Sequence, residues 1–159
     1  MSSHRISKII SGGQTGADRA GLDVAIELGI AHGGSIPSGR RTEDGPLPAK
    51  YDSMTELRSR HYQVRTEKNV IDADATLLFT NRKMGSGSAL TREVAGKHHK
   101  AFLHINLGKK TDDEAVGEVS QWLEDTKPRV LNIAGSRETE AGGIYSRVCS
   151  ILRQVLGDQ

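Results

Sequence analysis

Short apolar segments alternate with longer segments of helical spacing along the whole chain, and this alternation constrains the fold more than any other feature. Residues 6–11, 75–80 and 101–107 have the composition of buried β-strands. Residues 17–28 and 143–156 carry apolar side chains at the spacing of an amphipathic helix. Strands that alternate with helices form right-handed crossovers, which produce a mainly parallel sheet with helices on both faces. We therefore predict an α/β fold with three layers, α/β/α.

The remaining segments complete this pattern. In chain order they are a strand at 30–36, an irregular loop at 37–48, a helix at 64–72, a glycine-rich turn at 84–88, a helix that ends near 97, a helix that begins at 112, and a strand at 130–134. The pattern predicts about five strands and about five helices. A length of 159 residues fits one domain, so we predict a single domain over residues 1–159.

The composition argues against several classes of partner. The 22 Lys and Arg residues nearly balance the 20 Asp and Glu residues, whereas nucleic acids and anionic lipids require a concentrated basic surface. Aromatic residues make up 4% of the chain, which leaves little for the stacking that binds single strands. No segment approaches the roughly 18 consecutive apolar residues of a membrane span. We expect neither a nucleic acid nor a membrane as partner.

The single cysteine indicates a reducing compartment. Cys149 cannot form a disulfide within the chain, and a zinc cluster built from cysteines is excluded as well. The opening residues lack the apolar stretch of a secretory signal. The histidines lack the spacing of metal ligands, and no Ser-His-acid set can be assembled from the sequence order, so no metal site or catalytic residue is assigned. We expect a cytoplasmic protein.

A glycine-rich turn follows the first strand and leads into the first helix. Its candidate ligand-binding residues are Gly12, Gly13, Gln14, Thr15, Gly16 and Asp18. Glycines let the backbone approach a ligand, and the amides at a helix start attract anions such as phosphate. The order G-G-x-x-G matches neither the Walker A loop nor the G-x-G-x-x-G motif, so ATP hydrolysis and standard dinucleotide binding lose support. The alternative is a tight turn in which Thr15 or Asp18 only caps the helix.

A second glycine-rich turn follows the strand at 75–80. Its candidate residues are Gly85, Ser86, Gly87, Ser88 and Thr91. In parallel sheets, ligands bind beyond the carboxyl ends of the strands, where the strand order reverses. Both turns lie at that edge, so we predict that they face one shared crevice. The alternative for this segment is a flexible linker or a simple helix cap.

Charged residues in two further segments are candidates for ligand recognition. The loop between prolines contains Arg40, Arg41, Glu43 and Asp44, where an arginine could pair with phosphate and an acid could bind the nitrogens of a heterocycle. The helix at 64–72 adds Arg65, Glu67 and Asn69, of which Arg65 and Asn69 share a helix face. A solvated loop and ordinary surface pairing are the alternatives.

Four segments occur in an order that is specific enough to compare with known families. They are I-S-G-G-Q-T-G-A-D-R-A-G-L-D at 10–23, G-R-R-T-E-D-G-P at 39–46, R-T-E-K-N-V at 65–70 and G-S-A-L-T at 87–91. Together they resemble the molybdenum carrier family, a circularly permuted branch of the SLOG superfamily, whose members are Rossmann-like relatives of the Lonely Guy proteins. The resemblance covers about residues 9–107, and the final third of the chain matches only in general pattern.

The resemblance implies a Rossmann-like domain, usually a homo-oligomer such as a dimer or tetramer, that binds a nucleotide-like or pterin-like phosphate ligand. Carriers of this kind are thought to hold the molybdenum cofactor (molybdopterin), whose dithiolene sulfurs, not the protein, ligate the metal. Both glycine turns map to the family's ligand motifs. The resemblance therefore implies a carrier or storage protein for a phosphorylated small molecule, with no metal bound directly by the chain.

Two other functions remain open at this stage. The enzymatic relatives are phosphoribohydrolases with a P-G-G-x-G-T-x-x-E signature, where this chain has M-G-S-G-S-A-L-T-R-E. Such an enzyme would split the N-glycosidic bond of a nucleoside 5′-monophosphate, with Glu67 or Glu93 as acid or base. A nucleotide-sensing module is the third possibility. We favour a binding protein over an enzyme.

Overall fold

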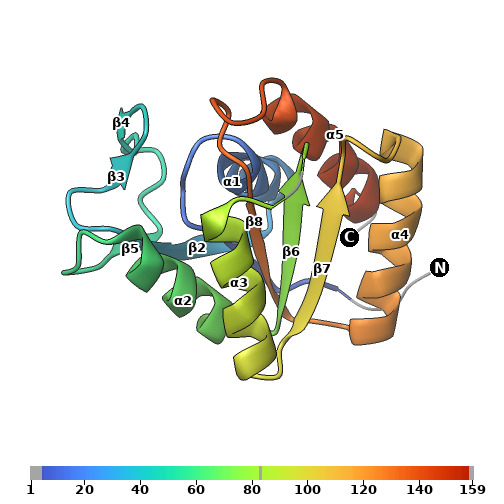
Figure 1. The fold of residues 1–159 in the computed structure, drawn as a ribbon, viewed down its shortest axis with the longest axis horizontal. Coiled ribbons are helices and arrows are strands. Elements are labelled where there is room, and N and C mark those ends of the chain that lie inside the picture. Colours follow the sequence, from blue (N-terminus) through green and yellow to red (C-terminus); the bar gives the residue numbers. More distant parts are fainter. Residues whose placement is uncertain (1–4, 83, 158–159) are drawn as a thin grey trace.

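Six parallel strands form the central sheet of this protein, in the order β5-β2-β1-β8-β6-β7 (Figure 1). The structure is a computed structural model that describes residues 5–82 and 84–157. The sheet strands are β1 (Lys8–Ile10), β2 (Ala31–Ile36), β5 (Met54–Glu56), β6 (Ala75–Thr80), β7 (Ala101–Asn106) and β8 (Val130–Gly135). A separate short hairpin pairs β3 (Arg41–Thr42) with β4 (Gly45–Pro46).

Helices cover both faces of the sheet, which confirms the predicted Rossmann-like α/β/α architecture. They are α1 (Ala17–Leu28), α2 (Tyr62–Asp72), α3 (Ser86–Lys97), α4 (Asp112–Thr126) and α5 (Ile144–Leu156). Helices α2 and α3 pack together on one face, whereas α1, α4 and α5 pack on the other (Figure 1). No helix in the described part of the chain has both the length and the apolar character that a bilayer crossing requires.

The main core lies between the sheet and the layer of α1, α4 and α5. Successive strand residues point to opposite faces, so Leu131 and Ile133 of β8 join this core. Helix α5 contributes an amphipathic face whose apolar residues are all buried, and this face includes Cys149. Asn132 and Ala134, the alternate residues of β8, face the α2 and α3 side. One face of β8 therefore packs in the main core, and the other face is turned toward α2 and α3.

The sequence prediction undercounted the strands. The sheet has six strands and not five, because β5 contains only three residues, of which Met54 alone is buried. Such a segment shows neither an apolar run nor an alternating pattern, so periodicity does not reveal it. The segment 37–48, expected to be irregular, contains the β3–β4 hairpin, whose strands have two residues each. The five predicted helices are all present, although α2 begins at Tyr62, two residues early.

The strand order places the carboxyl ends of β1, β8 and β6 side by side. The chain builds one side of the sheet with β1, β2 and β5, crosses to β6 and β7, and then inserts β8 between β1 and β6. Order reversal at this position is where parallel sheets open a crevice for ligands. The turns after β1 and β6 and the loop after β8 all leave the sheet at this edge.

A substitution at Gly34 in β2 tests how tightly the strands pack beside this crevice. Its φ is +124°, and a Cβ built there would lie 2.1 Å from the Ser11 carbonyl oxygen. We expect Gly34→Ala to lower the free energy of unfolding by more than about 2 kcal/mol, because it adds both a clash and a disfavoured φ. Gly117→Ala is the control, since Gly117 lies within α4 with open space around it. This control should raise stability by about 0.5 kcal/mol in urea denaturation. Equal effects of the two substitutions would contradict the assigned packing.

Candidate functional site

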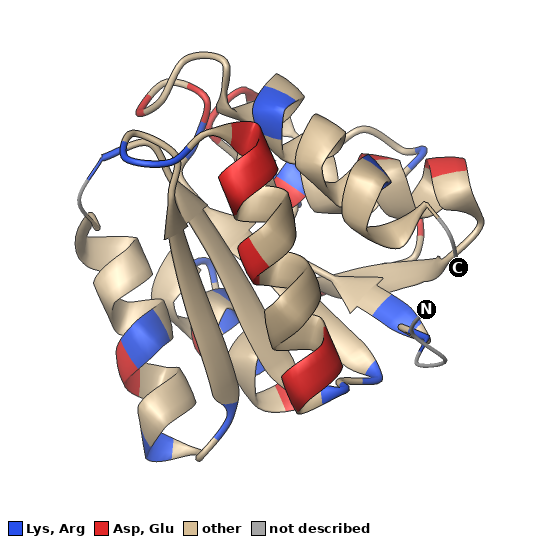
Figure 2. Cartoon of the chain, turned by 90° about the vertical axis from the view of Figure 1, so that its right-hand side faces the viewer, with Lys and Arg blue, Asp and Glu red and all other residues tan. Residues whose placement is uncertain are grey.

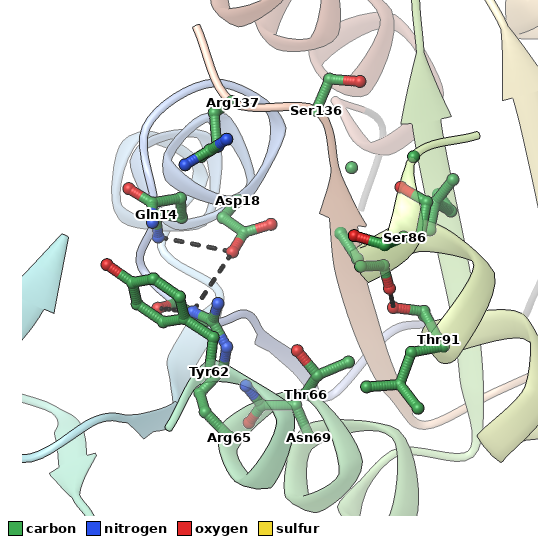
Figure 3. A pocket seen from close by; sticks show the side chains of 18 of the residues that line it. Gln14, Asp18, Tyr62, Arg65, Thr66, Asn69, Ser86, Thr91, Ser136 and Arg137 are labelled. Atoms are coloured by element: carbon green, nitrogen blue, oxygen red, sulfur yellow. Dashed lines mark hydrogen bonds and ion pairs between the residues drawn. The ribbon is translucent and has the colours of Figure 1, made fainter. Parts of the chain in front are cut away.

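A cavity of about 490 Å³ opens at the carboxyl edge of the sheet, between α2, α3 and the loop after β8 (Figure 3). This volume lies within the range of small-molecule sites. The lining comes from five parts of the chain: the β1–α1 turn, α2, Leu78 of β6, the start of α3, and β8 with the loop that follows it. The prediction that both glycine turns face one shared cavity is confirmed.

The cavity collects most, but not all, of the predicted ligand-binding residues. Those that line it are Gly12, Gln14, Asp18, Arg65, Asn69, Gly85, Ser86, Gly87, Ser88 and Thr91. Those that lie outside its lining are Gly13, Thr15, Gly16, Arg40, Arg41, Glu43, Asp44 and Glu67. The second turn and its helix contribute every predicted residue, whereas the loop between prolines contributes none. A role in binding a ligand remains a prediction for each of these residues.

Three amides of the first glycine turn already have acceptors within the protein. Gly13 donates to Ser11 Oγ at 3.2 Å, and Gln14 donates to Asp18 Oδ2 at 3.4 Å. Thr15 donates to Gln14 Oε1 at 3.1 Å. Further along, the amide of Ala17 donates to the Ser136 carbonyl oxygen at 3.2 Å. These contacts occupy several amides before and at the start of α1, so the first turn is less open to an anion than its glycines suggested, and its role in binding a ligand stays a prediction.

The glycines of this turn instead permit close packing between segments. Gly16 has φ +80°, and a Cβ built on it would lie 2.2 Å from the Ser136 carbonyl oxygen. A Cβ on Gly12 would lie 2.1 Å from Arg65 Nη1. Larger residues would push the β8 loop and the Arg65 side chain away from the turn. The first turn therefore shapes the cavity wall.

Asp18 and Arg65 form a buried pair of opposite charge in this wall. Arg65 Nη1 lies 3.8 Å from Asp18 Oδ2 and donates to the Gly12 carbonyl oxygen at 2.6 Å. Burial raises the pKa of Asp18 to about 6, although Arg65 and the Gln14 amide oppose this shift. Burial also lowers the pKa of Arg65, while the Asp18 carboxylate opposes it. One Asp18 oxygen meets Arg65 and Gln14, and the other points toward the cavity (Figure 3).

The start of α3 is an open helix end at the cavity, and the start of α2, which lines the same cavity, likewise has neither a side-chain cap nor an acid in its first turn within the described residues. Within the described residues, the amides of Ser86, Gly87 and Ser88 have no hydrogen-bond acceptor, no side chain caps the helix, and its first turn carries no acid. The hydroxyl of Thr91 is less available to a ligand, because it already donates to the Gly87 carbonyl oxygen at 2.9 Å. Free amides and an uncompensated helix dipole favour an anion at this position.

The other helix ends near this region of the fold show what a satisfied start looks like. Helix α4 has a capping box, in which Thr111 and Glu114 bind each other's backbone amides, and acidic residues occupy its first turn (Figure 2). Glu138 accepts hydrogen bonds from the amides of Gly143 and Tyr145 at the start of α5. At the starts of α4 and α5, side chains of the protein accept hydrogen bonds from the first amides. Within the described residues, no side chain does so at the start of α3.

Arg137 and Glu140 face the start of α3 from the loop after β8. Arg137 Nε donates to Glu140 Oε1 at 3.1 Å and lies 3.7 Å from Glu43 Oε2. A Cβ built on Gly85 would lie 3.8 Å from Glu140 Oε2, so this carboxylate lies beside the helix start. The charges that line the cavity thus form two opposite pairs, Asp18 with Arg65 and Glu140 with Arg137. An incoming anion would compete with Glu140 for Arg137.

The two arginines of the proline-flanked loop have different surroundings. Arg40 donates to the carbonyl oxygens of Leu47, Pro48 and Tyr51, and these hydrogen bonds hold the loop in its folded shape. Arg41 lies over the ring of Tyr62, with Cζ 4.7 Å from the ring centroid, and lines a second cavity of about 350 Å³. Neither arginine reaches the lining of the first cavity.

The two acids of this loop bind protein groups as well. Glu43 accepts hydrogen bonds from Thr15 and Thr139. Burial opposes its ionisation, but these hydrogen bonds and Arg137 outweigh the burial and lower the pKa of Glu43. Asp44 pairs with Arg19 at 3.1 Å, and the pair lowers the pKa of Asp44. Both acids therefore fasten the hairpin to α1 and to the β8 loop.

Three further residues of α2 and α3 were proposed for polar recognition or catalysis, and only one of them lines the cavity. Asn69 lines the cavity, but its amide binds both the Ser35 amide, at 2.7 Å, and the Ser35 carbonyl oxygen, at 3.1 Å. Glu67 and Glu93, the candidate acids of a hydrolase, are exposed and outside the cavity lining. Neither glutamate is positioned to act on a ligand in this cavity.

Several lining residues escaped the sequence analysis. Tyr62 and Gln63 come from the start of α2, and Asn132, Ser136, Arg137 and Glu140 come from β8 and its loop. The strand at 130–134 was predicted, and Gly135 with Ser136 follows it in the way that a glycine turn follows β1 and β6. The position of a third small-residue turn after a third strand was the available signal.

Fold and cavity together define a Rossmann-like ligand-binding domain. The chain belongs to the circularly permutated YpsA SLOG family, whose model matches residues 9–156. It is also similar to a crystal structure from Syntrophus aciditrophicus SB described as "Putative molybdenum carrier protein". The two chains share 42% identity with a TM-score of 0.93, and the match covers 96% of each. No curated protein matches the chain.

The buried acid predicts a specific dependence of stability on pH. Because the pKa of Asp18 is raised from 3.8 to about 6, the folded protein holds a proton that the unfolded chain releases within this range. Stability attributable to Asp18 therefore decreases as the pH rises from about 4 to about 6. We expect the free energy of unfolding of Asp18→Asn, relative to wild type, to increase by about 2 kcal/mol between about pH 4 and pH 7.

Urea denaturation across this pH range measures the effect. The diagnostic quantity is the slope of the stability difference against pH, because any effect of the substitution that does not depend on pH cancels in this slope. A difference that does not change with pH would contradict the raised pKa of Asp18.

Proposed function

We propose that this protein is a carrier that holds a phosphorylated small molecule in the cavity, with the molybdenum cofactor as the leading candidate. The observation that carries the proposal is the uncapped start of α3, whose first amides have no acceptor among the described residues and which borders a cavity of about 490 Å³. The phosphate of the cargo would accept hydrogen bonds from the amides of Ser86, Gly87 and Ser88. Arg137 would supply a compensating charge from the opposite side.

The charge balance of the cavity supports holding rather than chemistry. Asp18 is paired with Arg65, and Glu140 with Arg137, so each acid in the lining already has a cationic neighbour. Glu67 and Glu93, the acids expected to act in a nucleotide hydrolase, are exposed and outside the cavity lining. These placements favour a carrier over the phosphoribohydrolase or sensor alternatives.

The molybdenum cofactor fits the donor chemistry of the site. The similar protein from Syntrophus aciditrophicus SB carries the name of a molybdenum carrier. Cys149 of α5 is buried in the core, and the described residues contain no group of three or more His, Cys, Asp or Glu side chains that could hold a metal ion. In our proposal the pterin dithiolene ligates the metal, and the protein binds the phosphate and the organic part. We propose that the carrier acts as a homo-oligomer in the cytoplasm.

Replacing one residue at the start of α3 tests the phosphate position. Ser86→Pro removes an amide donor at the first helical position, where proline fits the helix, and Gly85 before it has the extended φ and ψ that proline requires. Loss of a hydrogen bond to a charged group should lower cargo affinity about 10-fold or more. Ser86→Ala is the matched control, because it removes the hydroxyl and keeps the amide.

Native mass spectrometry of protein purified from its own host gives the readout. Wild type and Ser86→Ala should carry a phosphorylated small molecule, and Ser86→Pro should have lost most of it at an unchanged melting temperature. Wild-type protein free of any such molecule, or equal occupancy in all three proteins, would refute the carrier proposal.

Glu140 provides a test that does not depend on the identity of the cargo. Its carboxylate lies beside the α3 start and binds Arg137, so it competes with an anion for both. Glu140→Gln should tighten the binding of inorganic phosphate, because it removes the competing charge. We expect a change of only about threefold, because the side chains of Arg137 and Glu140 are partly exposed and solvent screens their interaction. Glu67→Gln, which removes the same charge outside the cavity, should leave the affinity unchanged in calorimetric titration. Weaker phosphate binding by Glu140→Gln would contradict the assigned competition.

A further inference from the structure

Asn132 carries an unsatisfied polar atom at the floor of the cavity. Its side chain is 3% exposed and lines the cavity from the middle of β8. The amide Nδ2 donates to Thr76 Oγ1 at 3.2 Å, whereas Oδ1 has no hydrogen-bond partner among the described residues. Buried carbonyl groups without a partner are uncommon and cost stability, so this atom requires an explanation.

The surroundings of Asn132 make a purely structural explanation weak. Its neighbours on the cavity floor are Leu78 of β6 and Ala134 of β8, which are apolar. A leucine in place of Asn132 would suit this floor and the sheet beneath it. The Asn132–Thr76 pair therefore places one hydrogen-bonding group at an otherwise apolar floor.

We propose that Asn132 Oδ1 accepts a hydrogen bond from an N–H group at the buried end of the cargo, so that the cargo is a phosphorylated nitrogen heterocycle and not a sugar phosphate. This inference rests on the carrier function proposed above. The phosphate end would lie at the start of α3, where Ser86 and Gly87 are exposed, and the heterocycle would lie at the buried floor. A cargo with opposite polar ends would then span the cavity.

The chemical class follows from the acceptors on the wall and floor. Asn132 Oδ1 and the Asp18 oxygen that points toward the cavity both accept hydrogen bonds (Figure 3). A pyrimidine ring that carries an amino group and an adjacent ring N–H presents several donors on one edge. Pterins and guanine share this edge. In this proposal Thr76 acts as a positioning residue, because its hydroxyl accepts the hydrogen bond from Asn132 Nδ2 and leaves Oδ1 as the acceptor for the cargo.

Stability separates a ligand-binding role from a structural one. Replacing both members of a buried polar pair by apolar residues of similar shape is close to neutral or stabilising when neither group is needed for folding. We expect the double variant Asn132→Leu with Thr76→Val to melt at or above the wild-type temperature. A purely structural hydrogen bond predicts a lower melting temperature for this variant. A fall in the melting temperature to below that of wild type would overturn the inference.

Binding of small probes supplies the second measurement. Guanosine 5′-monophosphate and neopterin phosphate carry the donor edge on a purine and on a pterin, and ribose 5-phosphate carries only the anionic end. Wild type should bind one of the heterocyclic probes more tightly than ribose 5-phosphate. In Asn132→Leu that preference should fall about 10-fold, because one hydrogen bond is lost, while the affinity for ribose 5-phosphate stays unchanged.

The outcomes keep this inference apart from the carrier proposal. An unchanged preference in Asn132→Leu, with the heterocyclic probes still bound, would overturn the role of Asn132 and leave the phosphate site intact. Failure of wild type to bind any of the three probes would overturn the proposed phosphate site, and the inference with it. A loss of affinity for neopterin phosphate in Asn132→Leu indicates a pterin cargo, and a loss of affinity for guanosine 5′-monophosphate indicates a purine nucleotide.

Discussion

Parallel pairing of β8 between β1 and β6 is the constraint on which the rest of the structure depends. This pairing brings three chain exits to one edge of the sheet, although they lie far apart in the sequence. The exits pack too closely for larger residues, because a Cβ built on Gly135 would lie 2.0 Å from the Phe79 carbonyl oxygen and one on Gly16 would lie 2.2 Å from that of Ser136. Glycine at these positions allows the strand ends to converge and leaves the cavity between α2 and α3.

Within that frame, the two glycine turns have different roles. The turn after β1 uses its own side chains and the β8 loop to satisfy its amides, and it holds the buried pair of Asp18 and Arg65. After β6, the first amides of α3 have no acceptor in the part of the chain that the structure describes. A helix start without a cap is tolerable because it faces a cavity that water or a ligand can enter. The start of α3 is therefore the position at which we propose that an anion binds, whereas protein groups accept several hydrogen bonds from the amides of the first turn.

Much of the fold could be predicted from the sequence, but only part of the site. The long apolar runs at 75–80 and 101–107 gave their strands correctly, and α1 was placed at both ends. The short strand β5 gave no periodic signal, so it was missed. Ser86 and Ser88 were found because they follow a strand, whereas Asn132 was missed because one polar residue in a strand has no local signature. Arg40 and Glu43 bind protein groups and lie outside the cavity lining, and their predicted role in ligand binding stays a prediction.

The sequence by itself determined the layered architecture, the parallel sheet and the edge at which both glycine turns emerge. These features follow from local patterns, since hydrophobic periodicity and glycine positions act over a few residues. Only the tertiary structure decided which amides are free and which charged groups already have a partner. Hydrogen bonds such as that from Ala17 to Ser136, and the pairing of Arg137 with Glu140, depend on how β8 docks between two distant strands. No local pattern encodes that juxtaposition, because it arises when the whole sheet has assembled.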